Sequence, residues 1–394
     1  MSTTFIPLSD VETYLDPRLW KICGAAILQS THYSQDIDTL IAEIESLSPT
    51  ISELTTVIEY HGLSGLTHSL LKEYQIDVPL PANLVIKASS VKHAQRWQAI
   101  VKVLVHIQKN IDKEIRFCLL KGSALTTQIY AEPFHRAMSD IDLICAPENV
   151  ESFFQQCLEF GFTGSTKLEA LKDHHHLPAI SKKEGQHQIA LEIHTHALSF
   201  DLPEQLAWDD FQQNLRSFNI GEERFLSLPH EEMLFQLSSH AFARDQVIKL
   251  SNLVDIFRYA IIFEHVIDWN KIEDQFSKVI TTMRYSRLLL DLPENVLPQI
   301  KPIPKGLANK VTGLGESMLP LRELSNTQIN FVNRLHLLFF PSLWWQLIFY
   351  NIQVTDSSGA WQGLKQYYQI GFVRFFKHPT KVAYWIVTKT VKSN

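Results

Sequence analysis

The segment between residues 115 and 145 constrains the fold most, because short runs of different periodicity follow one another in a fixed order. Residues 115–120 are a short, β-rich apolar run that leads into a Lys-Gly-Ser turn at 121–123. Residues 124–130 are helical in character, and residues 139–145 alternate polar and apolar side chains with the period of a half-buried strand. Strand, turn, helix and strand in this order predict a small mixed α/β unit.

Helical periodicity flanks this unit on both sides. Apolar residues recur at three- and four-residue spacing over 39–58 and 84–111, with a proline-containing break at 79–83 between them. A helix is expected at 148–160 and a further strand at 187–197. Helical periodicity returns from 228 to about 290, before a proline-rich linker and an aromatic-rich end.

With 394 residues the chain exceeds what one core usually organises. We predict an N-terminal helical region (1–112), an α/β core with a small mixed sheet (113–226), a helical region walling a site (227–296), and a linker with a C-terminal segment (297–394).

Composition narrows the class of partner and the compartment. The net charge of -6 gives no global attraction to nucleic acid or to an anionic membrane, so any such contact must be local. The four cysteines form no Cys-x-x-Cys pair, and three of them lie in apolar runs typical of buried thiols. The N-terminus lacks the pattern of a secretion signal. We therefore expect a cytoplasmic protein, with the inner face of the membrane as a possible location.

Two aspartates on the second strand are the strongest chemical signal. Asp140 and Asp142 stand at i and i+2, so their carboxylates share one face of the strand. Hard divalent cations such as Mg²⁺ require oxygen ligands, and a third carboxylate on a neighbouring strand would complete a metal site. Glu192 lies on the polar face of the 187–197 strand and is the best candidate for that third ligand.

The Lys-Gly-Ser turn supplies groups that suit phosphate. Gly122 permits close approach to the backbone, and the helix that follows offers unpaired N–H groups and the positive end of a dipole. The Ser123 hydroxyl can donate a hydrogen bond to a β- or γ-phosphate. Lys121 and Arg136 are nearby cations that could neutralise phosphate charge. Each signal is weak alone; their order along the chain makes the combination specific.

In this combination the chain resembles the DNA polymerase β-like nucleotidyltransferase superfamily. It is most similar to an uncharacterised bacterial group within it, through Lys-Gly-Ser at 121–123, Arg136, and Ser-Asp-Ile-Asp-Leu at 139–143. The match extends to Glu192-Ile193-His194 and to a helical region with His240, Arg244 and Asp255, before Asp268-Trp269. The resemblance implies a polymerase-β-like α/β core and transfer of a nucleotide, with Mg²⁺ or Mn²⁺ as cofactor. The gap from Ser123 to Asp140 is longer than in the minimal superfamily pattern, and the third acid is a glutamate where aspartate is commoner.

The expected mechanism assigns a role to each residue. Asp140 and Asp142 would hold the metal and Glu192 would ligate a second ion or act as general base. Lys121, Gly122, Ser123, Arg136 and His194 would contact the nucleotide; for His194 an ordinary hydrogen-bonded strand histidine is an equal alternative. The His-His-His run at 174–176 is expected to be a polar loop rather than a metal site. The NTP is a partner, and the acceptor could be a small molecule, a sugar or lipid intermediate, or a protein hydroxyl, with an RNA end less favoured.

The last segment suggests a second property. Residues 335–350 are almost wholly apolar, yet shorter than the ~20 residues of a spanning helix and interrupted by Pro341. Residues 361–394 carry six basic residues, no acidic residue and many aromatics. This pattern over 335–394 favours peripheral membrane contact, while a buried terminal helix pair with a basic rim remains open. Two other functions also remain open: a catalytically silent nucleotide-binding regulator and a membrane-associated scaffold.

Overall fold

The structure of the chain is a computed structural model. It describes residues 17–34, 37–165, 175–198, 202, 204–242, 249–290, 292–301, 303, 343–353, 369 and 371–384. Of the residues discussed above, His174, Arg244 and residues 304–342, 354–368, 370 and 385–394 lie outside these ranges, so most of the predicted 335–394 segment is not described.

A seven-stranded mixed sheet forms the centre of the α/β part, with the strand order β3-β4-β5-β2-β1-β7-β6. The strands are β1 (Phe117–Leu119), β2 (Asp140–Cys145), β3 (Thr163–Gly164), β4 (Ile180–Glu184), β5 (His187–His194), β6 (Arg216–Ile220) and β7 (Glu223–Ser227). β2 is parallel to β5 and β1 is parallel to β7, while the other neighbouring strands are antiparallel. The central strands β2 and β5 carry the predicted carboxylates, and β1 leads into the Lys-Gly-Ser sequence at 121–123.

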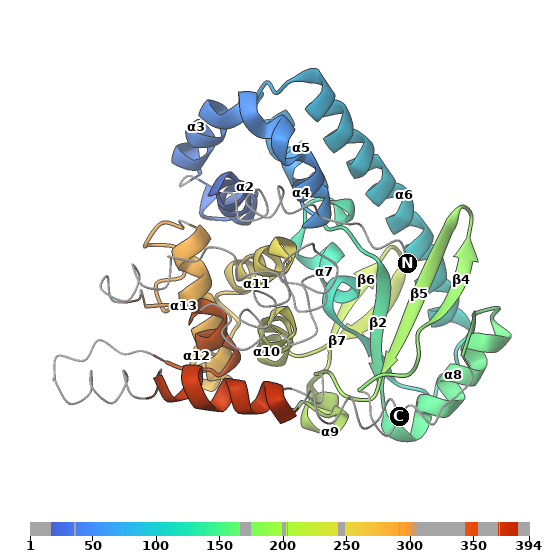
Figure 1. The fold of residues 1–394 in the computed structure, drawn as a ribbon. Helices are drawn as coiled ribbons and strands as arrows, with labels where there is room; N and C mark the ends of the chain where they lie inside the picture. Colours follow the sequence, from blue (N-terminus) through green and yellow to red (C-terminus); the bar gives the residue numbers. More distant parts are fainter. Residues whose placement is uncertain are drawn as a thin grey trace.

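Helices precede the sheet in the sequence, connect some of its strands and follow it (Figure 1). Before the sheet come α2 (Pro17–Leu28), α3 (Asp38–Leu47), α4 (Thr55–Tyr60), α5 (Ser64–Glu73) and α6 (Leu80–Asn110). Between strands lie α7 (Lys121–Ile129), α8 (Val150–Glu159) and α9 (Trp208–Phe211). After it follow α10 (His230–Ala241), α11 (Leu250–Ile262), α12 (Trp269–Gln275), α13 (Ser277–Leu290) and α17 (Leu343–Phe349). A small mixed sheet flanked by helical regions is the fold class that the sequence predicted.

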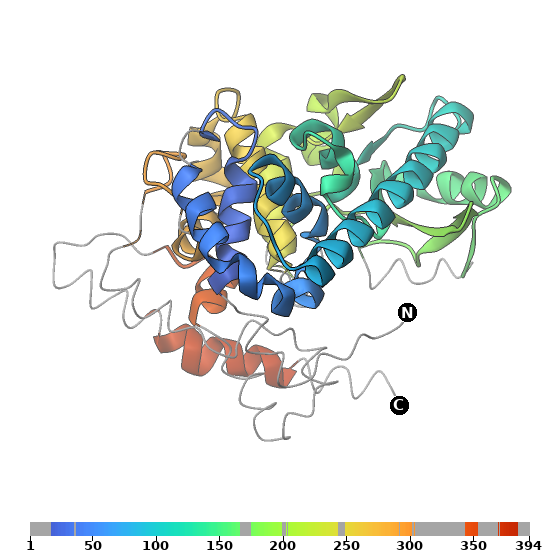
Figure 2. The same ribbon diagram turned by 90° about the horizontal axis from the view of Figure 1, so that it is seen from above.

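The long helix α6 connects the N-terminal helices with the sheet (Figure 2). It contacts β4, β5 and β7 and so crosses one side of the sheet. Arg96 fixes this crossing, because its guanidinium donates hydrogen bonds to the backbone oxygens of Met138 at 2.8 Å and Gln188 at 3.1 Å, and to that of Ser139. These carbonyls stand at the entrances of β2 and β5. The helix therefore holds the two carboxylate-bearing strands side by side.

The buried apolar residues of the described chain form one continuous cluster that runs from Leu19 to Val373. The predicted division into four regions is not visible as four separate cores, and its boundaries stay a prediction. All four cysteines are buried free thiols. Within the described residues no helix combines the length and the apolar character needed to cross a bilayer.

Local differences from the expected elements have local causes. The helix expected over 39–58 is interrupted, because Pro49 turns residues Ser48–Leu54 into a 3-10 helix between α3 and α4. The helix expected from residue 124 begins at Lys121, which places the whole Lys-Gly-Ser sequence in its first turn. The strand expected to run to residue 197 ends at His194. The strands β3, β4, β6 and β7 were not expected, because each is at most five residues long and contains few buried apolar residues.

Candidate functional site

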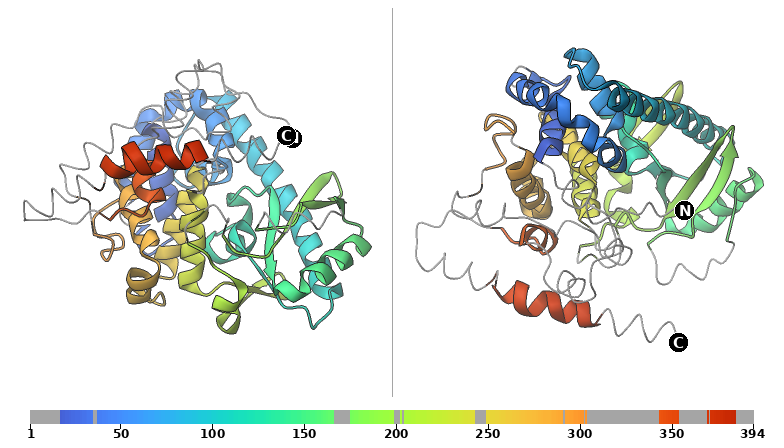
Figure 3. Two further views of the ribbon diagram at one scale, coloured as in Figure 1. Left: turned by 60° about the horizontal axis from the view of Figure 1, so that its bottom comes forward. Right: turned by 45° about the horizontal axis from the view of Figure 1, so that its top comes forward.

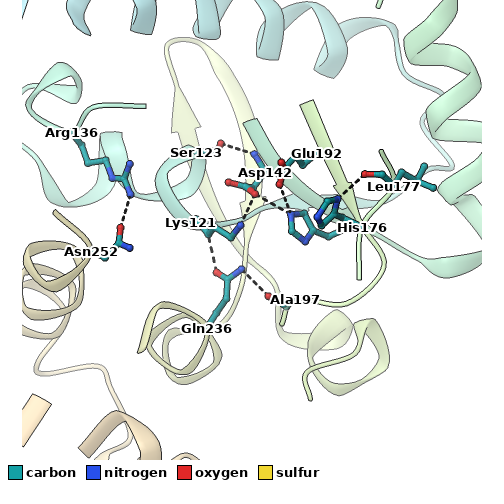
Figure 4. Close-up of polar contacts among 11 residues, drawn as sticks. Lys121, Ser123, Arg136, Asp142, His176, Leu177, Glu192, Ala197, Gln236 and Asn252 are labelled. Atoms are coloured by element: carbon teal, nitrogen blue, oxygen red, sulfur yellow. Dashed lines mark hydrogen bonds and ion pairs between the residues drawn. The ribbon is translucent and has the colours of Figure 1, made fainter. Parts of the chain in front are cut away.

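Two parallel strands bring the predicted carboxylates together. In the register of β2 and β5, Asp142 lies directly beside Glu192, and Asp140 lies beside Ala190. Residues two apart on a strand share a face, so Asp140, Asp142, Glu192 and His194 all project from the same side of the sheet. Figure 4 shows Asp142 and Glu192 next to each other, with Lys121 reaching towards them from the start of α7.

Asp142 is the centre of a buried charge network. Its Oδ1 atom accepts the Lys121 Nζ ammonium at 2.7 Å and lies 3.0 Å from His194 Nε2. Burial by itself would raise the pKa of Asp142, but the Lys121 ammonium and the hydrogen bond with His194 lower it well below its usual range. Burial alone would likewise lower the pKa of Lys121, yet Asp142 raises it overall. Both groups are therefore held in their charged forms.

A set of three groups could hold a metal ion. Among the described residues, Asp142, Glu192 and His194 each offer one ligand atom within 4.8 Å of the others, and His194 Nε2 is 3.7 Å from Glu192 Oε2. The hydrogen bond with His194 lowers the pKa of Glu192, so this carboxylate is also ionised. The set contains His194 in place of Asp140, which the sequence predicted as a metal ligand together with Asp142 and Glu192.

Asp140 has a different environment from its neighbour. Burial and, next, the nearby carboxylates of Asp142 and Glu192 together raise its pKa to about 6, against the opposing effect of Lys121. Among the residues that the structure describes, Asp140 has no lysine partner of the kind that Asp142 has in Lys121. A divalent cation beside it would favour its ionised form in the same way that Lys121 favours that of Asp142.

The first turn of α7 lies against β2. Gly122 and Ser123 are buried, and the Ser123 Oγ accepts a hydrogen bond from the Asp142 backbone N–H at 3.2 Å. A Cβ atom at Gly122 would lie 3.3 Å from the guanidinium carbon of Arg136, so glycine here also permits close approach of that side chain. The serine hydroxyl keeps its own proton for another acceptor.

Arg136 is bound within the protein. Its Nε and Nη2 atoms donate to Asp255 Oδ2 at 3.0 and 2.9 Å, and Nη1 donates to the Ala137 carbonyl at 2.6 Å. Asp255 on α11 also accepts a hydrogen bond from the Tyr130 hydroxyl at the end of α7. Arg136 thus connects the loop before β2 with α11. Its guanidinium also lies next to Gly122.

Two residues of α10 approach the site from the helical wall. Gln236, which was not predicted, accepts the Lys121 backbone N–H at 3.4 Å and donates to the Ala197 carbonyl at 3.3 Å. Burial, reinforced by the nearby Lys121 charge, lowers the pKa of His240 well below its ordinary value. A polar residue on the apolar face of the 230–241 helix was the available sequence signal for Gln236.

The other histidines lie around β5. The rings of His175 and His176 each lie 5.3 Å from that of His194, and His176 pairs with His194 in an isolated bridge. His196 follows the end of β5 and forms a bridge with Ala207, so it does not continue the face of Glu192. The metal-capable set defined above includes none of these three.

Comparisons with known proteins show which family the chain matches. The profile of a family described as "uncharacterised nucleotidyltransferase" matches residues 48–290. Among solved structures, an antigenic nucleotidyltransferase-like protein from Paracoccidioides brasiliensis is similar at 15% identity and a TM-score of 0.31, over 50% of this chain and 96% of that one. A TM-score this low carries no argument. No curated protein matches the chain.

Proposed function

Because this chain belongs to the uncharacterised nucleotidyltransferase family, we propose that it moves a nucleoside monophosphate from an NTP to an acceptor hydroxyl. The observation that carries this proposal is the direct pairing of Asp142 with Glu192 on parallel strands, beside the first turn of α7. A carboxylate cluster next to a helix N-terminus is what a triphosphate bound with a cation requires. The acceptor is a small molecule, a sugar or lipid intermediate, or a protein hydroxyl.

The donor set fits a divalent cation. Asp142 and Glu192 are ionised oxygen ligands, and His194 has a buried Nδ1 atom without a hydrogen-bond partner among the described residues. Asp140, on the same strand face, can add a further oxygen ligand once ionised. Mg²⁺ favours oxygen ligands, whereas an imidazole nitrogen is better tolerated by Mn²⁺, so Mn²⁺ suits the set with His194. Such an ion would supply positive charge that neutralises the phosphates during transfer.

The residues of the chain divide the remaining tasks. The backbone N–H groups in the first turn of α7, with the Ser123 hydroxyl, hold the β- and γ-phosphates. Lys121 and Arg136 supply neighbouring positive charge. The acceptor oxygen forms a bond to the α-phosphorus, the bond to the β-phosphate oxygen breaks, and pyrophosphate leaves. The lowered pKa of Glu192 makes it a better ligand than base, because a general base works best with a pKa near the operating pH.

The first test measures the binding of each of the four NTPs by thermal shift, in the presence of Mg²⁺ or Mn²⁺ and without metal. We expect one NTP to raise the Tm only when the metal is present, since a ligand at a hundred times its Kd stabilises by about 2.7 kcal/mol. The Asp140→Asn/Asp142→Asn variant should lose this shift. The matched control is Asp77→Asn, which removes an exposed carboxylate far from the site in sequence and should keep it.

Two results would count against the proposal. A folded wild-type protein that shows no shift with any NTP has no such donor site. Binding of an NTP without label transfer from its α-phosphate to any component of a cell extract would favour the catalytically silent regulator instead.

A second candidate property concerns the C-terminal helix over residues 371–384, which contacts α17 (Figure 3). The helix α17 is itself packed against α13. Phe372, Phe376 and Tyr384 are 59%, 64% and 72% exposed, and the rings of Phe372 and Phe376 are stacked. Lys377 and Lys381 are also exposed, and residues 361–394 contain no acidic residue. Exposed aromatic rings beside basic residues suit an anionic lipid surface, so we propose peripheral membrane contact through this helix.

Sedimentation with vesicles tests this contact. The full chain should sediment with phosphatidylcholine vesicles that contain phosphatidylserine and much less with phosphatidylcholine alone. Phe372→Ser/Phe376→Ser should reduce the bound fraction several-fold. The control Leu84→Ser/Val91→Ser changes two exposed apolar residues of α6 and should bind as the wild type does. Binding to single-stranded RNA in place of vesicles would refute the lipid assignment.

A further inference from the structure

Lys121 occupies the position where a cation is needed. Its ammonium lies 2.7 Å from Asp142 Oδ1, and the two side chains are 14% and 7% exposed. The same oxygen belongs to the metal-capable set with Glu192 and His194. In the structure, therefore, one positive charge of the chain itself already neutralises the central carboxylate.

The backbone at Lys121 is held for this contact. Its φ angle is +46°, in the left-handed region that a lysine rarely adopts. Its N–H is bound by Gln236 of α10, which in turn binds the Ala197 carbonyl just after β5. An unfavourable backbone conformation supported by contacts from two other elements marks a position under functional constraint. It also fixes the root of the lysine side chain at the first residue of α7.

We propose that Lys121 is the resident counter-cation of the Asp142 site, and that it excludes a free divalent ion while admitting a metal–NTP complex. The admission of a metal–NTP complex rests on the proposed function, whereas the exclusion of a free ion does not. A bare Mn²⁺ ion bound by Asp142 would lie beside the ammonium and be repelled by it. A metal–NTP complex carries net negative charge, and its phosphates at the first turn of α7 give the ammonium a new partner. The lysine stem is flexible enough to turn from Asp142 to a phosphate.

This change of partner, from Asp142 to phosphate, explains why a lysine with little exposure precedes Gly122 and Ser123. While the site holds no ligand, Lys121 prevents Asp142 and Glu192 from repelling each other as two unneutralised carboxylates. With the metal–NTP complex bound, the same ammonium faces the phosphates. Lys121 therefore allows the site to bind a divalent ion that is carried by an NTP and disfavours the same ion when it is free.

Calorimetric titration with MnCl₂ alone, in the absence of nucleotide, tests the exclusion. Wild type should bind Mn²⁺ weakly, and Lys121→Met should bind it at least tenfold more tightly. Adding Asp142→Asn to Lys121→Met should remove the gain. Lys121→Arg keeps the positive charge and should keep the exclusion. The matched control is Lys109→Met. Lys109 is outside the site and pairs with Glu223 at 3.1 Å, so this variant should bind Mn²⁺ as wild type does.

The effect on stability provides a second measurement. Lys121→Met leaves Asp142 without its counter-charge, so its Tm should fall without metal and recover when Mn²⁺ alone is added. Equal or weaker Mn²⁺ binding by a folded Lys121→Met variant would overturn the proposal. Titration of the Mn²⁺–NTP complex then separates the two hypotheses. Lys121→Met should bind it at least tenfold more weakly than wild type; if wild type binds no NTP, the proposed function fails while the exclusion is still decided by Mn²⁺ alone.

Discussion

Replacing Asp255 with asparagine is expected to reduce the stability of the protein by about 3–5 kcal/mol, the usual cost of breaking a buried ion pair. Asp255 is 1% exposed and accepts two hydrogen bonds from Arg136 and one from Tyr130. The substitution leaves a buried guanidinium without its anion, while the neutral amide can accept only weaker hydrogen bonds. In a chain of 394 residues the midpoint of thermal unfolding should fall by roughly 4–6 °C.

Urea unfolding followed by tryptophan fluorescence measures this loss. The control is Glu53→Gln, which removes the anion of an exposed pair with Arg18 at 3.0 Å and should change stability by less than about 1 kcal/mol. The double variant Arg136→Met/Asp255→Leu removes both charges and should recover most of the loss. A change within 1 kcal/mol for Asp255→Asn would show that the pair does not hold α11 against the loop before β2.

The second large effect is expected at Arg258, where methionine should lower stability by at least about 3 kcal/mol because several buried carbonyls lose their donor. Arg258 on α11 donates to the backbone oxygens of Ala26 at 2.6 Å and Gln29 at 2.7 Å, at the end of α2. It also donates to Ile129 at 2.9 Å, at the end of α7. These are carbonyls that a helix leaves without internal partners, and the positive charge complements both helix dipoles.

Thermal unfolding of Arg258→Met and Arg258→Lys tests this role. Lysine keeps the charge, but its single ammonium cannot reproduce the planar fork that reaches two helix ends, so it should recover less than half of the loss. Arg116→Met is the control, because Arg116 is exposed and donates to one carbonyl, that of Gln212 at 3.2 Å. A Tm for Arg258→Met equal to that of the control would contradict the prediction. Since α7 carries Gly122 and Ser123 at its other end, NTP binding should weaken together with stability.

The sequence predicted the parts of the site that depend on local periodicity. Asp140 and Asp142 share a strand face because side chains alternate with period two, and the same rule placed Glu192 and His194 on one polar face of β5. The order of strand, turn, helix and strand correctly predicted the fold class. The turn expected at residues 121–123 is instead the first turn of α7, because the helix begins three residues earlier than expected.

The partners of the charged residues could not be predicted in this way. Lys121 and Arg136 were both expected to face phosphate, yet one is paired with Asp142 and the other with Asp255, 119 residues away. Gln236 approaches Lys121 from 115 residues along the chain. Sequence spacing carries no information about such contacts, since they depend on how α10 and α11 pack against the sheet.

The sequence by itself thus determined the chemistry that is present: a carboxylate-bearing strand pair, a glycine-serine helix start and nearby cations, because each is set by residues within one or two turns or strands. Only the tertiary structure decided which cation neutralises which carboxylate. That choice follows from burial: a charge removed from water must find its counter-charge wherever packing places one, and packing brings together residues from distant parts of the chain.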